Sequence, residues 1–227
     1  RRAVRDTQEG AKIMIIAVDG PAASGKGTLA SGLARHYGLP CLDTGLLYRA
    51  VGRAVEAYEN SPEFEQRAIA AAQSLDEGDI EPEFLLSAKV GTLASKVAVI
   101  GAVRSALFDY QRAFATQPGG AVLDGRDIGT RIAPDADVKL FIQADSKARM
   151  ERRARQLEAR GTVVDRYALY HQIEERDARD RQNPHGGFYK ADDAHLLDTT
   201  LLDIEAALRA AIAIVDGVMA SRAGSKP

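Results

Sequence analysis

The chain has 227 residues and a formal net charge of −2 at pH 7, with 45% hydrophobic and 27% charged residues. This length permits one well-buried core with appended mobile parts, and the nearly balanced charge argues against a partner, such as nucleic acid, that is held by a global basic field. The single cysteine, Cys41, excludes a disulfide framework, and no apolar stretch is long enough for a membrane span, so we expect a cytoplasmic protein without nucleic-acid or membrane partners.

The N-terminal residues come first in chain order. Residues 1–13 contain three arginines but lack the apolar core of a signal peptide. Because the chain does not begin with Met, and Met14 stands where a natural start would fit, we expect residues 1–13 to be an extension of native or artificial origin. A single domain is expected over residues 14–222, followed by a frayed tail over residues 223–227.

Short apolar runs alternate with longer stretches of helical spacing along this domain. The runs predict strands at residues 13–19, 39–42, 121–124, 138–144 and 195–197. The helical stretches lie at residues 25–37, 46–58, 62–74, 82–97, 103–116, 146–160, 165–182 and 202–221. This alternation predicts right-handed crossovers and a parallel sheet covered on both faces. The expected fold class is α/β, a three-layer α/β/α domain with a five-stranded parallel sheet.

Two stretches interrupt the alternation of strands and helices. Residues 60–100 are expected to be helical with an acidic turn, and residues 149–190 are dense in arginine. In open α/β sheets ligands bind beyond the carboxyl ends of the strands. Insertions at these positions are therefore expected to cover a substrate and to be able to close over it.

The first strand leads into a glycine-rich turn, a lysine and a helix, which is the layout of a phosphate-binding loop (P-loop). Glycines let the backbone turn successive N–H groups toward one point, the helix adds its positive dipole end, and the lysine adds a mobile charge. A chance glycine-rich turn is the alternative, but the strand, the helix and the full spacing argue against it. The loop comprises Gly20, Pro21, Ala22, Ala23, Ser24, Gly25, Lys26, Gly27 and Thr28.

The end of this loop narrows the class of protein. Gly27 follows the lysine, and the hydroxyl arrives one position later, at Thr28. The usual pattern places a hydroxyl for Mg²⁺ directly after the lysine. A Gly-Lys-Gly-Thr ending resembles the adenylate-kinase-like nucleoside monophosphate kinases and argues against a switch GTPase.

A second motif follows the second predicted strand. Asp43 ends the strand, Gly45 is expected to turn the chain, and Arg49 lies one helical turn after Gly45. This spacing aims an arginine at the crevice that the phosphate loop faces. An ordinary helix cap followed by a surface arginine would give the same pattern.

A third motif follows the third predicted strand. Asp124 stands at the end of an apolar run, where a carboxylate can support a water bound to Mg²⁺. Arg126 and Asp127 come directly after it and are expected to project into the crevice. A solvated loop is the alternative, which the strand-end placement disfavours.

The three motifs in this order resemble the bacterial cytidylate kinase family. They read Gly-Pro-Ala-Ala-Ser-Gly-Lys-Gly-Thr at residues 20–28, Leu-Asp-Thr-Gly-Leu-Leu-Tyr-Arg at residues 42–49 and Leu-Asp-Gly-Arg-Asp-Ile-Gly-Thr at residues 123–130. The similarity runs from about Ile15 to the last helix. It implies a P-loop kinase fold with a helical CMP-binding insert over residues 60–100 and an Arg-rich lid over residues 149–190.

The resemblance implies transfer of the γ-phosphoryl group of ATP to CMP or dCMP, giving ADP and CDP or dCDP. The acceptor phosphate is already an anion, so the difficulty is repulsion between two polyanions rather than activation of a nucleophile. Positive charge, Mg²⁺ as cofactor and in-line placement must supply the catalysis. ATP and CMP or dCMP are the expected partners, and the expected oligomeric state is a monomer.

Residue roles follow from the resemblance. Residues 20–28 would cradle ATP, and Thr28 and Asp124 would reach Mg²⁺ through water rather than directly. The acceptor-side residues would be Thr44, Arg49, Ser95, Arg104, Arg126, Asp127, Arg176 and Asp180. The residues nearest the chemistry would be Lys26, Arg126, Asp127, Arg152 and Arg153, the last two as lid arginines on a helix whose face could equally be solvated.

Within the acceptor set the resemblance assigns distinct tasks. Arg49 and Arg126 would hold the acceptor phosphate, and Arg176 and Asp180 would lie near the ribose. The base would be read by Ser95, Arg104 and Asp127. Cytosine offers a donor at N4 and acceptors at N3 and O2, which suits a carboxylate together with Arg and Ser donors. Uracil presents an acceptor at position 4 and would face the carboxylate unfavourably.

The chain departs from the family pattern in two places. Many relatives have an arginine at the position of Asn183, so one ligand of the acceptor phosphate is missing unless Arg179 or Arg181 substitutes for it. The region between Arg49 and Ser95 is shorter than in the long bacterial form and shows little alternating β pattern. We therefore expect this region to be mainly helical.

Two other functions stay open at this point. A kinase for UMP, AMP or shikimate could share the scaffold, and the cytosine-reading set argues against it. A nucleotide-binding switch or assembly module that hydrolyses slowly would need a guanine-reading motif such as Asn-Lys-x-Asp, which the sequence lacks. It would also leave the acceptor-side arginines without a purpose.

Overall fold

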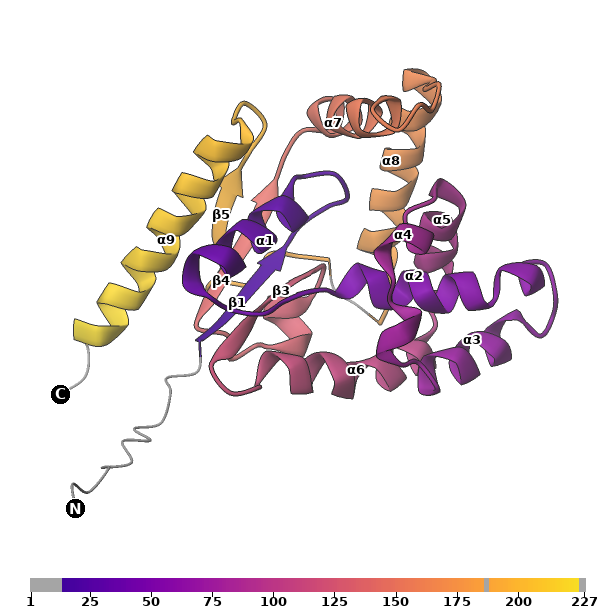
Figure 1. The fold of residues 1–227 in the computed structure, drawn as a ribbon, viewed down its shortest axis with the longest axis horizontal. Helices are drawn as coiled ribbons and strands as arrows, with labels where there is room; N and C mark the ends of the chain where they lie inside the picture. Colours follow the sequence, from indigo (N-terminus) through magenta and orange to yellow (C-terminus); the bar gives the residue numbers. More distant parts are fainter. Residues whose placement is uncertain (1–13, 186–187, 225–227) are drawn as a thin grey trace, which may run out of the picture.

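The computed structural model describes residues 14–185 and 188–224, so the expected extension over residues 1–13 lies outside the described residues. Within these described residues, five strands form one parallel sheet in the order β2-β3-β1-β4-β5 (Figure 1). They are β1 (Met14–Asp19), β2 (Cys41–Asp43), β3 (Gly120–Gly125), β4 (Val138–Gln143) and β5 (His195–Asp198). All five predicted strands are confirmed, with ends that differ by at most two residues from those expected.

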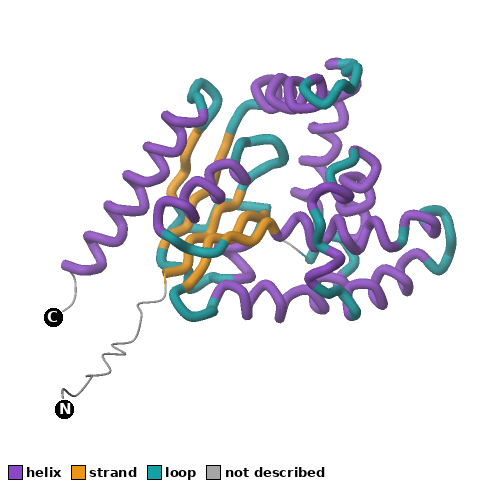
Figure 2. The backbone as a smooth tube through the Cα atoms, viewed as in Figure 1, coloured by secondary structure: helices purple, strands orange, loops and turns teal. Residues whose placement is uncertain are grey.

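Helices cover both faces of the sheet, which confirms the three-layer α/β/α prediction (Figure 2). The alternation along β1 shows how: Ile15 and Ala17 join one hydrophobic core, while Ile16 and Val18 join the other. Helices α1 (Lys26–Tyr37) and α9 (Ile204–Gly224) pack on one face. The other face carries α2 (Thr44–Ala54), α3 (Phe64–Gln73), α5 (Ala88–Val97) and α6 (Gly101–Ala115).

The predicted helix over residues 82–97 is wrong in one respect, because it consists of two helices. A short helix α4 (Pro82–Leu85) ends before Ser87, and α5 begins after it. Ser87 caps α5, since its hydroxyl accepts a hydrogen bond from Val90 N at 3.1 Å. Apart from this break the expectation for residues 60–100 is correct, because every regular element there is helical, including the 3₁₀ turn η2 (Glu77–Asp79).

Other helix ends also differ from the prediction, and at the start of α2 the reason is local. Asp43 caps α2 by accepting from Gly45 N at 2.9 Å, so this helix begins at Thr44 and Gly45 lies in its first turn instead of turning the chain. It ends at Ala54 and is followed by a separate 3₁₀ turn, η1 (Glu56–Tyr58). At the other end of the chain α9 continues to Gly224, so the first two residues of the expected tail are helical.

Helices α7 (Ser146–Glu158) and α8 (Arg166–Gln182) pack against each other beyond the carboxyl ends of β1 and β4, with α7 running across the view and α8 down it (Figure 1). They have a small hydrophobic core of their own, formed by Met150, Ala154, Leu169 and Ile173. This helix pair occupies the segment that the arginine-rich sequence marked. Within the described residues no single helix is both long and apolar enough to cross a membrane; only the bent pair α5 and α6, at 101°, reaches that length and apolarity together.

Candidate active site

The phosphate-binding loop joins β1 to α1, and two of its glycines meet steric demands. Gly25 precedes α1 with φ 91°, a left-handed backbone that residues with a Cβ rarely adopt. Gly27 lies against Asp124, and a Cβ there would stand 2.9 Å from Asp124 Oδ2. Any side chain at position 27 would displace this carboxylate, which is a physical reason for the hydroxyl to come one residue later, at Thr28.

Side chains from outside hold the backbone of the loop. Ala22 O accepts from Arg149 Nη1 at 3.1 Å, and Ser24 O accepts from Arg152 Nη1 at 3.2 Å and from Thr199 Oγ1 at 2.9 Å. Helix α1 has no side-chain cap, so the N–H groups of its first turn are available as donors. Together with the helix dipole they form a site suited to phosphate oxygens.

Lys26 and Asp124 bring opposite charges together beside the loop. Lys26 Nζ lies 3.4 Å from Asp124 Oδ1. Burial raises the pKa of Asp124 to about 6, although Lys26 opposes this shift. Burial, and then the charge of Arg126, lower the pKa of the Lys26 ammonium. A buried cation whose charge is disfavoured in this way gains strongly from an anionic ligand.

The same carboxylate fits a divalent cation. Apart from its ion pair with Lys26, the buried Asp124 Oδ1 has no hydrogen-bond partner among the described residues. Asp43 and Thr28 line the same groove beside α1. No group of three His, Cys, Asp or Glu with metal-ligand geometry exists in the described part of the chain. Such a sparse set suits Mg²⁺, which proteins usually hold through one or two carboxylates, phosphate oxygens and water.

Asp19, at the end of β1, connects the phosphate loop to the segment after β3. Its carboxylate oxygens accept from Ile128 N and Gly129 N, each at 2.8 Å. These bonds hold the start of η3 (Ile128–Ile132), a π-helical turn directly after Asp127 that was not predicted. Burial raises the pKa of Asp19 to about 7, against the opposing effect of both hydrogen bonds. Asp19 was not among the predicted site residues, although its strand-end position is the signal that identified Asp124.

A second pocket lies next to the loop and gathers residues from α2, α5, α6, α8 and the segment after β3. It is lined by most of the predicted acceptor-side residues, namely Thr44, Ser95, Arg104, Arg126, Asp127, Arg176 and Asp180, together with Tyr48 and Asn183. Residues that are far apart in the sequence therefore converge as expected. Their individual roles stay predictions.

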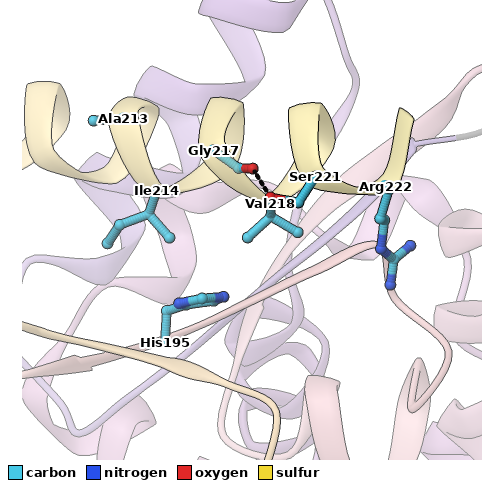
Figure 3. Close-up of a pocket in the computed structure, with 7 residues that line it drawn as sticks. All are labelled: His195, Ala213, Ile214, Gly217, Val218, Ser221 and Arg222. Carbon is cyan, nitrogen blue, oxygen red and sulfur yellow. Dashed lines mark hydrogen bonds between the residues drawn. The ribbon is translucent and has the colours of Figure 1, made fainter. Parts of the chain in front are cut away.

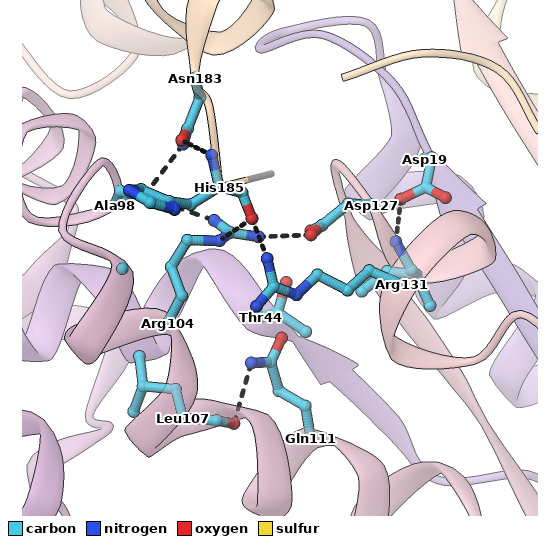
Figure 4. Close-up of polar contacts among 12 residues, drawn as sticks. Asp19, Thr44, Ala98, Arg104, Leu107, Gln111, Asp127, Arg131, Asn183 and His185 are labelled. Atoms are coloured by element: carbon cyan, nitrogen blue, oxygen red, sulfur yellow. Dashed lines mark hydrogen bonds and ion pairs between the residues drawn. The ribbon is translucent and has the colours of Figure 1, made fainter. Parts of the chain in front are cut away.

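Arg104 and Asp127 form a buried ion pair in this pocket (Figure 4). Arg104 Nη2 donates to Asp127 Oδ2, and the two residues are 7% and 6% exposed. Ser95 is also buried, and its hydroxyl donates to Gly91 O at 3.4 Å. The hydroxyl of Thr44 donates to Asp124 O at 2.8 Å, so its proton holds the end of β3 in place.

Arg126, Asp180 and Arg176 form the charged wall of the pocket nearest Lys26. Arg126 Nε donates to Asp180 Oδ2 at 2.9 Å. Burial, and then the neighbouring Arg126, lower the pKa of Arg176 to about 10. Arg176 Nε is buried without a hydrogen-bond partner among the described residues. An unpaired guanidinium beside a second one is a position that an anion would stabilise.

Arg49 differs from the other acceptor-side predictions, because it is not among the residues that line this pocket. Its Nη1 donates to Leu85 O at 2.7 Å and to Ser87 O at 3.2 Å, which ties α2 to the junction between α4 and α5. Burial lowers the pKa of Arg49, and the charges of Arg153 and Arg126 contribute. The guanidinium thus lies within the positive field of the site but makes structural contacts in this arrangement.

The two predicted lid arginines have different surroundings. Arg152 donates to Ser24 O, to Thr199 and, at 3.3 Å, to Leu202 O, so it anchors α7 to the phosphate loop. The alternative of a solvated helix face is therefore wrong for Arg152. Arg153 is half-buried, and its Nη1 donates to Gln156 Oε1 at 3.3 Å.

The most buried ion pair near the site was not predicted. Arg149 and Asp177 are 2% and 1% exposed, and Arg149 Nη2 lies 2.6 Å from Asp177 Oδ2. Because Arg149 also donates to Ala22 O, the pair connects α7, α8 and the phosphate loop. Spacing in the sequence could not distinguish the buried Arg149 from Arg155, which lies on the same helix and is exposed.

A groove at the opposite edge of the sheet is separate from this site (Figure 3). It lies between His195, where β5 begins, and the last turns of α9, including Ile214 and Arg222. In a parallel sheet all strands begin on one side and end on the other, and the site residues described above follow the carboxyl ends of strands. The groove therefore lies at the amino ends of the strands, away from the phosphate loop.

The arrangement concentrates positive charge between a phosphate-binding loop and a pocket with paired donors and acceptors. Lys26 and Arg176 each have a lowered pKa for which Arg126 is one cause. Such a cluster is suited to two phosphate-bearing ligands placed side by side, because each ligand would relieve repulsion among the cations.

The chain resembles known proteins along nearly its whole length. Residues 16–216 match the family described as cytidylate kinase. A cytidylate kinase of Methylocella silvestris is 53% identical over 212 residues, covering 93% of this chain and 98% of the relative. One of Xanthobacter autotrophicus is 53% identical over 209 residues, covering 92% of this chain and 100% of the relative. The crystal structure of an uncharacterized protein from Eubacterium ventriosum shares the fold, with a TM-score of 0.51 and 16% identity over 89% of this chain and 98% of that one.

Proposed function

This chain belongs to the cytidylate kinase family and transfers the γ-phosphoryl group of ATP to CMP or dCMP, and we propose where its two substrates bind. ATP would lie on the loop of residues 20–28 and the acceptor nucleotide in the pocket beside it. The observation that carries this assignment is the cationic group to which the loop contributes Lys26 and the pocket lining contributes Arg126 and Arg176. The reacting phosphates of donor and acceptor would meet there.

On the donor side the loop would act through its backbone and its lysine. The N–H groups at the start of α1 would bind phosphate oxygens, and Lys26 would neutralise the outer phosphates. Arg152 and Thr199 would keep the loop in this conformation through Ser24 O. Arg153 would reach the triphosphate when the lid closes.

On the acceptor side the pocket would separate the phosphate from the base. Arg126 would hold the acceptor phosphate in line with the γ-phosphoryl group, and Arg176 with Asp180 would lie near the ribose. Asp127 would accept from cytosine N4, while Arg104 and Ser95 would donate to N3 and O2. These assignments are supported by the shared pocket and by the buried Arg104–Asp127 pair.

Mg²⁺ is the cofactor that fits the oxygen ligands beside the phosphate loop. Asp124 and Thr28 would hold it through water, close to the phosphate loop. When bound, it supplies charge neutralisation on the phosphates.

The lone free cysteine supports a cytoplasmic location. We propose a monomer in which residues 60–100 form the acceptor insert and residues 149–190 form the lid.

Replacing Asp127 tests the acceptor assignment. Asp127→Ala removes the proposed partner of cytosine N4 and leaves Arg104 buried without its counter-ion. We expect kcat/KM for CMP to fall roughly 10²-fold, and that for UMP to fall much less, so the preference for CMP over UMP narrows. A coupled ADP-release assay with CMP, dCMP, UMP and AMP measures this.

The exposed carboxylate of Asp109 on the neighbouring α6 provides a matched control. Asp109→Ala should leave both kcat/KM values unchanged. Unaltered discrimination in Asp127→Ala would remove Asp127 from the base-reading set. A better acceptor than CMP or dCMP in the wild-type protein would contradict the specificity itself.

The raised pKa values of two buried carboxyl groups predict that kcat/KM for ATP falls on the acidic side of its pH profile. Asp19 and Asp124, with pKa values raised by burial to about 7 and about 6, take up protons as the pH falls, so Asp124 loses its attraction for Lys26. We expect kcat/KM for ATP to decline between about pH 8 and about pH 5. The acceptor phosphate also titrates near a pKa of about 6, so the comparison must be made between variants. In Asp124→Asn the part of the decline in kcat/KM that lies near pH 6 should be absent. If the decline is unchanged in this variant, protonation of Asp124 is not its cause.

A further inference from the structure

The corner formed by Asn183, Pro184 and His185 follows α8, and its first residue, Asn183, lines the acceptor pocket (Figure 4). Both polar atoms of the Asn183 amide form a hydrogen bond with the backbone. Its Nδ2 donates to Ala98 O at 2.9 Å, and its Oδ1 accepts from His185 N at 2.9 Å. The side chain thus bridges the end of α5 and the corner itself.

The corner presents one carbonyl to two arginines. His185 O accepts from Arg104 Nε at 3.1 Å and also from Arg131 Nη1. Arg104 comes from α6 and Arg131 from η3, and Figure 4 shows both guanidinium groups turned toward this oxygen. The charge of Arg131 also reaches the pocket, because it is one of the causes that act on the pKa of Tyr48, which burial raises.

Three contacts define the plane of the Arg104 guanidinium. Nη2 meets Asp127, Nε meets His185 O, and Nη1 lies 3.5 Å from Ala98 O. The two backbone acceptors belong to the same residues, Ala98 and His185, that Asn183 ties together. A planar guanidinium held on three sides has little freedom to turn away, so little ordering remains to be done when a base binds.

We propose that Asn183 and Arg131 are positioning residues for base recognition. Asn183 sets the distance between the two carbonyls that orient Arg104, and Arg131 holds the His185 carbonyl from the opposite side. Residue 183 therefore acts on the base-reading end of the acceptor and not on its phosphate. The inference rests on the proposed role of Arg104 in reading cytosine.

Steady-state kinetics of Asn183→Ala test this role. We expect KM for CMP to rise roughly tenfold, while kcat and KM for ATP stay within about twofold and KM for UMP changes little. Gln182→Ala is the matched control, because Gln182 is exposed and immediately precedes Asn183. Asn183→Asp keeps the acceptor for His185 N but places a carboxylate oxygen against Ala98 O, so its KM for CMP should rise at least as far as that of Asn183→Ala.

Arg131 allows a second, independent measurement. Arg131→Ala should raise KM for CMP with the same pattern. The double variant Asn183→Ala/Arg131→Ala should raise KM for CMP only slightly more than Asn183→Ala alone does, because both residues act through the His185 carbonyl. Fully additive effects, or equal losses for CMP and UMP, would overturn the inference.

Arg104→Lys separates failure of this inference from failure of the proposed function. If Arg104→Lys narrows the preference for CMP over UMP and Asn183→Ala does not, the positioning role is wrong and the base-reading role stands. If Arg104→Lys leaves the preference unchanged, the base-reading role fails and the positioning role fails with it. Circular dichroism and thermal melting of each variant confirm that a folded protein was measured.

Discussion

Lys26→Ala is expected to lower kcat by roughly 10²–10³-fold, the range found when one preorganised donor to a transition-state charge is removed. Lys26 is the charged group of the phosphate loop, and its pKa is lowered because it is buried close to Arg126. An anionic transition state would relieve this repulsion, so its interaction with Lys26 strengthens as charge moves toward the transferring group. Steady-state kinetics with saturating CMP measure the loss.

The fold should survive this substitution. Asp124 loses its nearby cation but has a pKa already raised to about 6, so protonation can neutralise it. Lys147→Ala, at an exposed position on α7, is the matched control and should leave kcat unchanged. A kcat for Lys26→Ala close to that of the wild-type protein, with an intact far-UV circular dichroism spectrum, would contradict the role of Lys26.

Arg126→Ala is expected to lower kcat/KM for CMP by roughly 10²–10³-fold, through both KM and kcat. The guanidinium donates to Asp180 Oδ2 at 2.9 Å, and its charge helps to lower the pKa values of Lys26 and Arg176. It is therefore placed where the donor and acceptor phosphates would meet. KM for ATP should change less, because the N–H groups of the phosphate loop remain.

A double variant distinguishes phosphate binding by Arg126 from a merely structural ion pair. If Arg126 served only to neutralise Asp180, then Arg126→Ala/Asp180→Ala would recover most of the activity lost in Arg126→Ala. If Arg126 binds the acceptor phosphate, the double variant stays as impaired as the single one or becomes worse. Recovery of activity would refute the proposed role.

The strands and most helices were predictable because they depend on neighbours in sequence. Alternating or continuous apolar residues, capping residues and glycines encode β1, α1 and the phosphate loop within about twenty residues. The π-helical turn η3 was not predictable in this way, because it depends on Asp19, which lies 109 residues before Ile128. The break at Ser87 was a missed local signal, since a serine before a helical run is a common cap.

The acceptor-side residues were predictable as a set but not as individual contacts. Strand-end placement and the resemblance identified Arg104, Arg126 and Asp127, and the structure brings these residues into one pocket. Arg49 belongs to the same predicted acceptor-side set, yet it bonds to Leu85 O and Ser87 O outside the lining of that pocket. Long side chains have several partners within reach, so sequence position alone does not select one.

By itself, the sequence determined the fold class and the phosphate-binding loop, because both are encoded by local spacing, and its resemblance to a known family indicated the residue types of the acceptor site. Only the tertiary structure decided which guanidinium meets which partner: Arg149 with Asp177, Arg126 with Asp180, and Arg104 with both Asp127 and the His185 carbonyl. These choices depend on elements that are distant in the chain and on burial, which strengthens some charge pairs and leaves other cations in need of a ligand.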